Sequence, residues 1–192
     1  ACPGAAVVGM DLFAEGLQYA RRRTRCPLVR ADLRRPPFGR TFDLVGLFDV
    51  LEHFPDDVEL LRDLRALLSA QGVLMLTVPA HPSLWSYFDE ASHHCRRYES
   101  PDLERKLTAA GYRVDFISPY MMGILPLLWL GRRLATMFSD SDSARRLAAR
   151  ELRVTPVFNE LLALLLAPEA APLARRRRLP AGASLLAVAA PA

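Results

Sequence analysis

Two stretches of the sequence concentrate the side chains that could carry out chemistry. The first is Asp49-Val-Leu-Glu52-His53, in which two carboxylates and an imidazole follow an apolar run. The second is residues 81–100, HPSLWSYFDEASHHCRRYES, which hold three histidines and four aromatic residues in a short span. Histidine changes charge near neutral pH, so His53 and His94 are candidates for a general base that removes a proton from a reacting oxygen or nitrogen atom.

The elements that must position these side chains follow an alternating pattern. Short apolar runs are typical of strands buried on both faces of a parallel sheet, and they predict strands at residues 5–10, 28–30, 42–48, 73–78, 112–117 and 184–189. Apolar residues at helical spacing predict three helices. The first covers residues 12–23, the second begins at Asp56 or Asp57 and ends at Gly72, and the third runs from Ser100 to Gly111. Strands that alternate with helices indicate an α/β domain with a mostly parallel sheet.

The composition is that of an ordinary globular domain. The 192 residues suffice for one domain with a full core, 51% of them are hydrophobic, and the three cysteines lie far apart. Widely separated cysteines in odd number predict neither a zinc site nor a disulfide framework, so we expect a cytoplasmic protein. The net charge of +4 is mild, and Lys106 is the only lysine among 25 basic residues. This charge does not argue for a nucleic-acid partner.

A helical insertion before the last strand is expected over residues 120–178. Its longest apolar run, residues 120–130, contains a glycine and a proline and is shorter than the about 20 residues that a membrane span needs. A second apolar run, residues 161–167, precedes a cluster of arginines at residues 175–178. This combination is compatible with weak contact to an anionic membrane surface or a lipid-like acceptor, while core packing and a homodimer contact are the alternatives.

Acidic residues follow two of the predicted strands. Asp11 follows residues 5–10, and Asp32 follows residues 28–30. A carboxylate at the carboxyl end of the second strand of a Rossmann-like unit accepts hydrogen bonds from both hydroxyl groups of a ribose, so Asp11 is suited to hold a nucleoside. The same residue is equally suited to cap the following helix, and its position alone leaves both roles open.

The order of these motifs resembles the class I, Rossmann-like family of S-adenosylmethionine-dependent methyltransferases. The combination VVGMD…ADL…FDLVGLFDVLEHF…GVLMLTVP is similar to the small-molecule, type 11/12-like branch over residues 5–118, and SLLAVA resembles the final antiparallel strand of the family. The resemblance implies a mostly parallel sheet with helices on both faces and an antiparallel last strand. It also implies methyl transfer from S-adenosylmethionine to a small-molecule or lipid-like acceptor, at oxygen or nitrogen in preference to carbon.

The resemblance also assigns roles at a cofactor site. It places Asp11 at the ribose, Leu12 along the adenine, Asp32 and Leu33 at the adenine amino edge, and Phe48 and Asp49 beside the methionine part. The family's glycine-rich G-x-G-x-G loop lets the backbone approach the methionine carboxylate; it is expected before Ala1 and is absent from these 192 residues. We therefore expect the chain to be a fragment of a longer protein and to bind the cofactor weakly on its own.

Residues 81–100 resemble a segment of one bacterial branch of the superfamily, of the form HPxLWSxxDxxxxHxRRY. A loop with so many polar and aromatic groups at the carboxyl end of a strand is suited to recognise an acceptor or to cover the cofactor. The acceptor-binding candidates, with His94 as the base, are Trp85, Asp89, Arg97 and Tyr98. The alternative is that Asp89 pairs with Arg96 or Arg97 to fix the loop, with the tryptophan packed beneath it.

Three other interpretations stay open. Asp49-x-x-Glu52-His53 also resembles the metal-binding E-x-x-E-H motif of ubiquinone-pathway O-methyltransferases, but a shorter aspartate replaces the first glutamate, so we assign no metal ligand. A nicotinamide-dependent oxidoreductase would share the fold, but its Tyr-x-x-x-Lys pair is absent because Lys106 has no tyrosine in that register. A catalytically silent interaction module would account for the absent glycine-rich loop.

Replacing Asp11 tests its two roles. In the full-length protein, Asp11→Ala should weaken the binding of S-adenosylmethionine by about 1–3 kcal/mol, because charge-assisted hydrogen bonds to the ribose are lost. Titration calorimetry measures this affinity, and thermal unfolding measures the stability. Should the affinity hold while only the melting temperature falls, Asp11 is a helix cap and not a ribose ligand.

Overall fold

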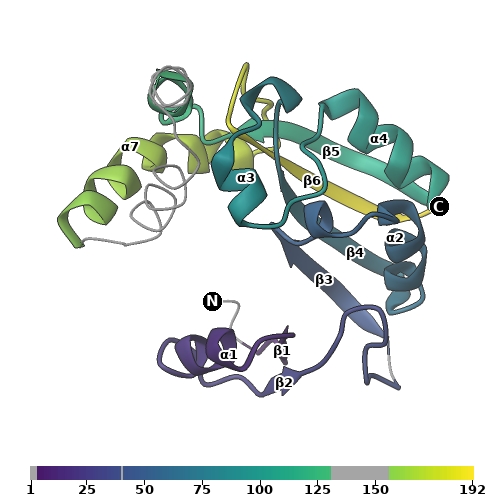
Figure 1. Ribbon diagram of the computed structural model, residues 1–192. Coiled ribbons are helices and arrows are strands. Elements are labelled where there is room, and N and C mark those ends of the chain that lie inside the picture. The colour runs from purple at the N-terminus through teal and green to yellow at the C-terminus, as the bar shows by residue number, and fades with distance from the viewer. Residues whose placement is uncertain (1–3, 40, 131–155) are drawn as a thin grey trace. The chain divides into compact units, whose positions relative to one another are not determined.

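The computed structural model describes residues 4–39, 41–130 and 156–192. The chain divides into two compact units, Ala1–Thr41 and Phe42–Ala192 (Figure 1). In the first unit, β1 (Gly9–Asp11) and β2 (Leu28–Arg30) pair in parallel, and α1 (Ala14–Arg21) connects them. The unit is therefore the predicted strand–helix–strand arrangement, although β1 is shorter than the expected strand at residues 5–10.

The second unit contains a four-stranded sheet with the order β3-β4-β6-β5. β3 (Phe42–Phe48) runs parallel to β4 (Leu68–Pro79). β6 (Ser184–Pro191) lies antiparallel between β4 and β5 (Tyr112–Tyr120). Three strands thus share one direction and the last strand opposes them, which confirms the predicted fold class.

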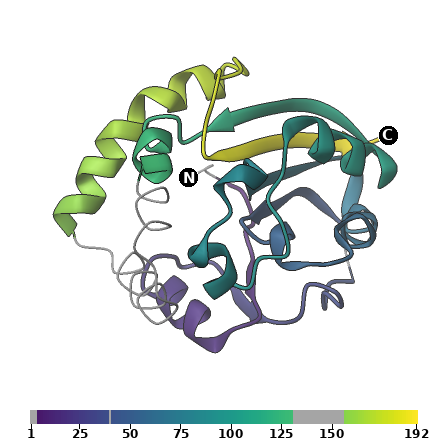
Figure 2. The ribbon, with the colours of Figure 1, turned by 45° about the horizontal axis from the view of Figure 1, so that its top comes forward.

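Helices α2 (Asp57–Arg65) and α4 (Ser100–Ala109) lie side by side against one face of this sheet (Figures 1 and 2). Their leucines form the core with side chains of the central strand: Leu60, Leu61, Leu64, Leu103, Leu107, Leu74, Leu76 and Val78 are all buried. α4 ends where predicted, because Gly111 takes up the left-handed φ of 86° that follows a helix end. This packing fixes the carboxyl end of β4, from which the loop of residues 81–100 leaves.

The structure corrects one predicted boundary. Gly72 does not end a helix: α2 stops at Arg65, and β4 has already begun at Leu68. The pairing of β3 with β4 shifts register between Phe42 and Leu44, and a Cβ atom added to Gly72 would lie 2.8 Å from the Phe42 carbonyl oxygen. Gly72 is therefore required by the close approach of two strands at a bulge and not by a helix end.

The described part of the expected insertion is helical. α7 (Pro156–Ala174) is joined to the segment after β5 by the buried Glu169, which accepts hydrogen bonds from the backbone N–H groups of Met121 (2.7 Å) and Gly123 (3.0 Å). Residues 131–155 lie outside the described residues. None of the helices that the structure describes is both long and apolar enough to cross a membrane.

Candidate active site

The first chemical segment follows β3. Asp49 has a left-handed φ of 50°, and its backbone N–H donates to the carbonyl oxygen of Thr77 (3.0 Å) at the end of β4. This turn leads into the short 3-10 helix η1 (Leu51–His53). Leu51 is fully buried and anchors η1, so the adjoining Glu52 is carried into the protein interior, where it is 0% exposed. Neither carboxylate oxygen of Glu52 has a hydrogen-bond partner among the described residues.

The second chemical segment is folded back onto η1. After the 3-10 helix η2 (Pro82–Leu84), a capping box formed by Ser86 and Asp89 starts the short helix α3 (Tyr87–Ala91). His93 then adopts a left-handed φ of 58°, which reverses the chain. The backbone N–H of the next residue but one, Cys95, donates to the carbonyl oxygen of Glu52 at 2.7 Å. This hydrogen bond brings the intervening histidine next to η1.

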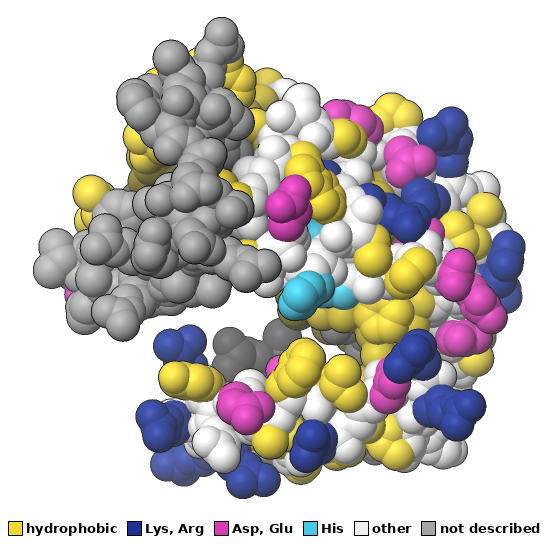
Figure 3. Space-filling model, viewed as in Figure 1, with side chains coloured by type: hydrophobic (Ala, Val, Ile, Leu, Met, Phe, Trp, Pro, Cys, Tyr) yellow, Lys and Arg dark blue, Asp and Glu magenta, His cyan; other side chains and the backbone are white. Residues whose placement is uncertain are grey.

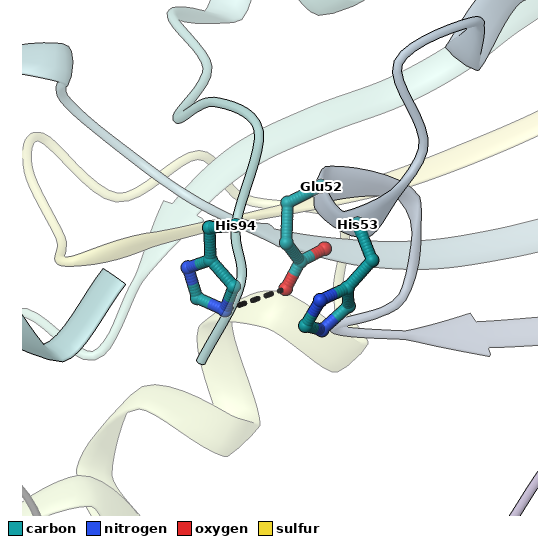
Figure 4. Close-up of side chains that lie close together, drawn as sticks. All are labelled: Glu52, His53 and His94. Carbon is teal, nitrogen blue, oxygen red and sulfur yellow. Dashed lines mark ion pairs between the residues drawn. The ribbon is translucent and has the colours of Figure 1, made fainter. Parts of the chain in front are cut away.

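Glu52, His53 and His94 therefore form a compact cluster, called the Glu52–His53–His94 cluster below (Figure 4). Nε2 of His94 lies 3.9 Å from Oε1 of Glu52, and the two imidazole rings meet edge to face with centroids 4.9 Å apart. The side chain of His94 is only 10% exposed, whereas His53 is exposed and histidine side chains reach the surface in Figure 3. The two predicted base candidates are thus brought together, with a buried acid beside them.

Asp89 holds His94 from the opposite side. Its Oδ1 atom accepts hydrogen bonds from Nδ1 of His94 (3.0 Å) and from Nε of Arg97 (2.7 Å). Arg97 in turn donates from Nη1 to the carbonyl oxygen of Ala80 at 3.0 Å, directly after β4. Asp89 is fully buried and Arg97 is nearly so. Their pairing is the loop-fixing alternative raised by the sequence, and it leaves an acceptor-binding role for either residue without support.

The cluster has unusual electrostatics. Burial without a hydrogen-bonding partner, together with the negative charge of Asp49, raises the pKa of Glu52 to about 7, while His94 and Arg97 act in the opposite direction. His53 is an exposed residue, but protein atoms around its ring remove part of its hydration. This desolvation, and the nearby His94, lower the pKa of His53. Glu52 therefore changes its protonation near neutral pH. No pattern in the sequence indicated that Glu52 would be buried without a hydrogen-bond partner among the described residues.

The same cluster could hold a divalent metal ion. One ligand atom from each of the three side chains lies within 4.8 Å of the others. A carboxylate with two imidazoles is a donor set that suits zinc and related ions. The set differs from the one suggested by the sequence motif, since His94 takes the place of Asp49.

Tyr98 lies in a position that differs from our expectation. Its side chain is 0% exposed, and its hydroxyl donates to Oδ2 of Asp57 at 2.9 Å. Asp57 also pairs with Arg96 (2.8 Å) and Lys106 (2.7 Å), so this buried aspartate joins the loop to α2 and α4. Burial and the charge of Asp57 raise the pKa of Tyr98. Tyr98 is thus a structural residue in this conformation, whereas Trp85 is 39% exposed and accessible to an acceptor.

The predicted cofactor residues occur in both units. In the first unit, Asp11 is the last residue of β1 and Asp32 lies just after β2, so both occupy the same edge, because parallel strands end together. Oδ1 of Asp11 accepts a hydrogen bond from the N–H of Phe13 (2.8 Å). A hydrogen-bonded pair with Arg34 (2.6 Å) lowers the pKa of Asp32 to about 2.

The other predicted cofactor residues are partly or largely accessible. Leu33, in the first unit, is half-buried and Leu12 is exposed. In the second unit, Phe48 is exposed at the end of β3, and Asp49 follows it on the turn toward η1. These positions are compatible with ligand contact and assign no role by themselves.

Comparison with known proteins decides the family. The family model described as "Methyltransferase domain" matches residues 3–115, which is more than half of the chain. The chain belongs to this methyltransferase family. The resemblance inferred from the motifs, to class I Rossmann-like methyltransferases, is thereby confirmed, and the oxidoreductase interpretation loses its support.

The similar proteins agree with this family. The chain is 28% identical over 85 residues to the ubiquinone biosynthesis O-methyltransferase of Actinobacillus pleuropneumoniae serotype 5b, an alignment that covers 38% of this chain and 36% of that relative. The chain therefore spans about a third of the length of the curated relatives it matches. An S-adenosylmethionine-dependent methyltransferase from Mesorhizobium loti has a TM-score of 0.55 at 17% identity, covering 97% of this chain and 81% of the other. One from Clostridium acetobutylicum has a TM-score of 0.53 at 9% identity, covering 97% and 75%. These structures show a shared fold.

The pKa of Glu52 predicts a pH-dependent stability. The folded state keeps a proton on Glu52 up to about pH 7, whereas an unfolded chain releases it near 4.5. Rising pH should therefore lower the unfolding free energy of the wild type relative to Glu52→Gln, which cannot titrate, by up to about 3 kcal/mol. Denaturant unfolding at about pH 5 and about pH 8 measures this difference. The exposed Glu59→Gln variant is the control, and parallel pH profiles for wild type and Glu52→Gln would contradict the assignment.

Proposed function

We propose that the protein transfers a methyl group from S-adenosylmethionine to a small-molecule or lipid-like acceptor, at oxygen or nitrogen, with His94 as the general base. The observation that carries the base assignment is the placement of His94, which is held by Asp89 on one side and faces the buried Glu52 on the other. Membership of the methyltransferase family supports the reaction type, and the O-methyltransferase relative supports oxygen as the methylated atom.

The chemistry follows from these groups. The acceptor oxygen or nitrogen attacks the methyl carbon, the bond from that carbon to the sulfonium sulfur breaks, and the electron pair remains on sulfur in S-adenosylhomocysteine. The acceptor proton passes to Nε2 of His94, so no high-energy charged product accumulates. Correct alignment of the two reactants supplies much of the acceleration, and the base adds to it. His53, exposed beside His94, is proposed to assist this proton transfer.

An apolar hollow beside the loop supports an acceptor with an apolar part. It has a volume of about 390 Å³ and is lined by His81, Ser83, Leu84, Leu125, Pro126 and Trp129. Its polar groups are few, as is usual in sites that bind small apolar ligands. We propose that Trp85 borders the acceptor. The same apolar character suits a lipid-like acceptor, and Leu161 and Leu164 of α7 are 61% and 72% exposed. Weak contact of α7 with a membrane surface fits that exposure.

The cofactor residues are proposed on the family resemblance. Asp11 would bind the ribose, Leu12, Asp32 and Leu33 the adenine, and Phe48 and Asp49 the methionine part. Asp32 would have to exchange its pairing with Arg34 for the adenine amino group, which is feasible because Arg34 is exposed. A cytoplasmic protein and a homodimer remain compatible with this proposal.

A metal-assisted variant of the reaction is the second candidate. A divalent ion held by the Glu52–His53–His94 cluster would lower the pKa of an acceptor hydroxyl that it bound, and a separate base would then not be required.

The His94→Ala variant tests the base. In the full-length protein it should lower kcat by about 10²–10⁴-fold, as loss of a general base does, while the Kd of S-adenosylmethionine stays nearly unchanged. Release of S-adenosylhomocysteine measures turnover on a panel of phenols, catechols and amines. His93→Asn is the matched control, because His93 is exposed and asparagine tolerates its left-handed φ. A change confined to KM would make His94 a binding residue. Turnover that chelators abolish and divalent ions restore would favour the metal-assisted variant.

A further inference from the structure

Both carboxylate oxygens of the buried Asp89 accept hydrogen bonds, and one of these bonds comes from the proposed base, His94. Oδ1 accepts from Nδ1 of His94 and from Nε of Arg97, and Oδ2 accepts from the backbone N–H (2.9 Å) and the hydroxyl (3.2 Å) of Ser86. The carboxylate is 0% exposed. A capping role for α3 requires only the contacts to Ser86, and the contact with Arg97 fixes the loop, so the contact with His94 needs a separate explanation.

We propose that Asp89 is a positioning residue that holds His94 in the tautomer with the proton on Nδ1, so that the lone pair on Nε2 is available to the acceptor. This inference rests on the proposed function of His94 as a base. Asp89 thus acts through His94 and does not contact the acceptor itself.

The tautomer follows from the donor and acceptor inventory. A carboxylate can only accept a hydrogen bond, so the ring nitrogen 3.0 Å from Oδ1 of Asp89 must be the one that donates. A neutral imidazole has a single N–H group, and Nε2 is therefore left with its lone pair. That atom is the one that lies 3.9 Å from Glu52 at the cluster. In solution the proton resides on Nε2 in most neutral histidines, so a protein that needs Nε2 as the base must hold the other tautomer.

The orientation of the ring is fixed by the same contacts. Arg97 links Asp89 to the carbonyl oxygen of Ala80, directly after β4, and the N–H of His94 donates to the carbonyl oxygen of Asp89 at 2.9 Å. Asp89 is thus attached to the end of the central strand, and the imidazole is attached to Asp89. The base consequently has a defined position relative to the sheet edge where the acceptor is proposed to bind.

The Asp89→Asn variant of the full-length protein separates positioning from support. An amide can donate to Nδ1, which releases the constraint on the tautomer. We expect kcat to fall by about 10²–10⁴-fold, as when the aspartate behind a catalytic histidine is lost, with the KM of the acceptor and the Kd of S-adenosylmethionine changed by less than about threefold. The Asp89→Glu variant keeps an accepting carboxylate and should recover part of kcat.

Nitrogen-15 NMR of the imidazoles gives a readout that does not depend on activity. We expect the neutral His94 of the wild type to carry its proton on Nδ1 and that of Asp89→Asn to shift toward Nε2. Ser86→Ala is the matched control: it removes the hydroxyl at Oδ2 and weakens the cap of α3, but it should leave the tautomer and kcat unchanged.

Two results would overturn the proposal. A proton on Nε2 of neutral His94 in the wild type would do so without any variant, even if Asp89→Asn failed to fold. Equal losses of kcat in Asp89→Asn and Ser86→Ala, with an unchanged tautomer, would make Asp89 a purely structural residue. If the tautomer is confirmed but no acceptor is methylated, the proposed function fails while the positioning of His94 stands.

Discussion

A buried carboxylate is tolerated only where charged or polar donors surround it, and the pairing of Asp89 with Arg97 and His94 meets this condition inside the loop that follows β4. The requirement determines the conformation of residues 81–100. Asp89 starts α3 through its capping box and draws Arg97 back to the carbonyl oxygen of Ala80. Together with the hydrogen bond from the N–H of Cys95 to the carbonyl oxygen of Glu52, that pair holds His94 next to η1, so that the two chemical segments form one site.

Glu52 shows the opposite arrangement. Leu51 anchors η1 in the core, and the neighbouring carboxyl is buried with no hydrogen-bond donor among the described residues. Such burial is unfavourable for an ionised group, and the pKa of Glu52 rises to about 7. Perturbed acids of this kind gather at functional sites, because a structural role would be served better by a satisfied or apolar side chain. The two buried acids therefore differ: Asp89 is satisfied and holds His94, whereas Glu52 faces His94 without a hydrogen-bond donor among the described residues.

The sequence predicted the alternation of elements well, because apolar runs and helical spacing report burial directly, and β2, β3 and α4 appear almost where expected. It failed at Gly72, where a glycine needed for a close strand contact was interpreted as a helix end. It also grouped Tyr98 with the acceptor-binding residues, although the hydroxyl is buried against Asp57, forty-one positions away in sequence. Motif spacing indicates which side chains share a loop, but only long-range packing decides which of them face inward.

Chemical rescue is the measurement that tests the central claim most directly. We propose that the lone pair on Nε2 of His94 removes the acceptor proton during methyl transfer from S-adenosylmethionine. In a full-length His94→Ala variant, added imidazole should restore part of the lost turnover in a saturable manner, and it should leave a His93→Asn variant unaffected. Methyl transfer that remains fast without His94, or a slow variant that imidazole never rescues despite normal cofactor binding, would contradict the account.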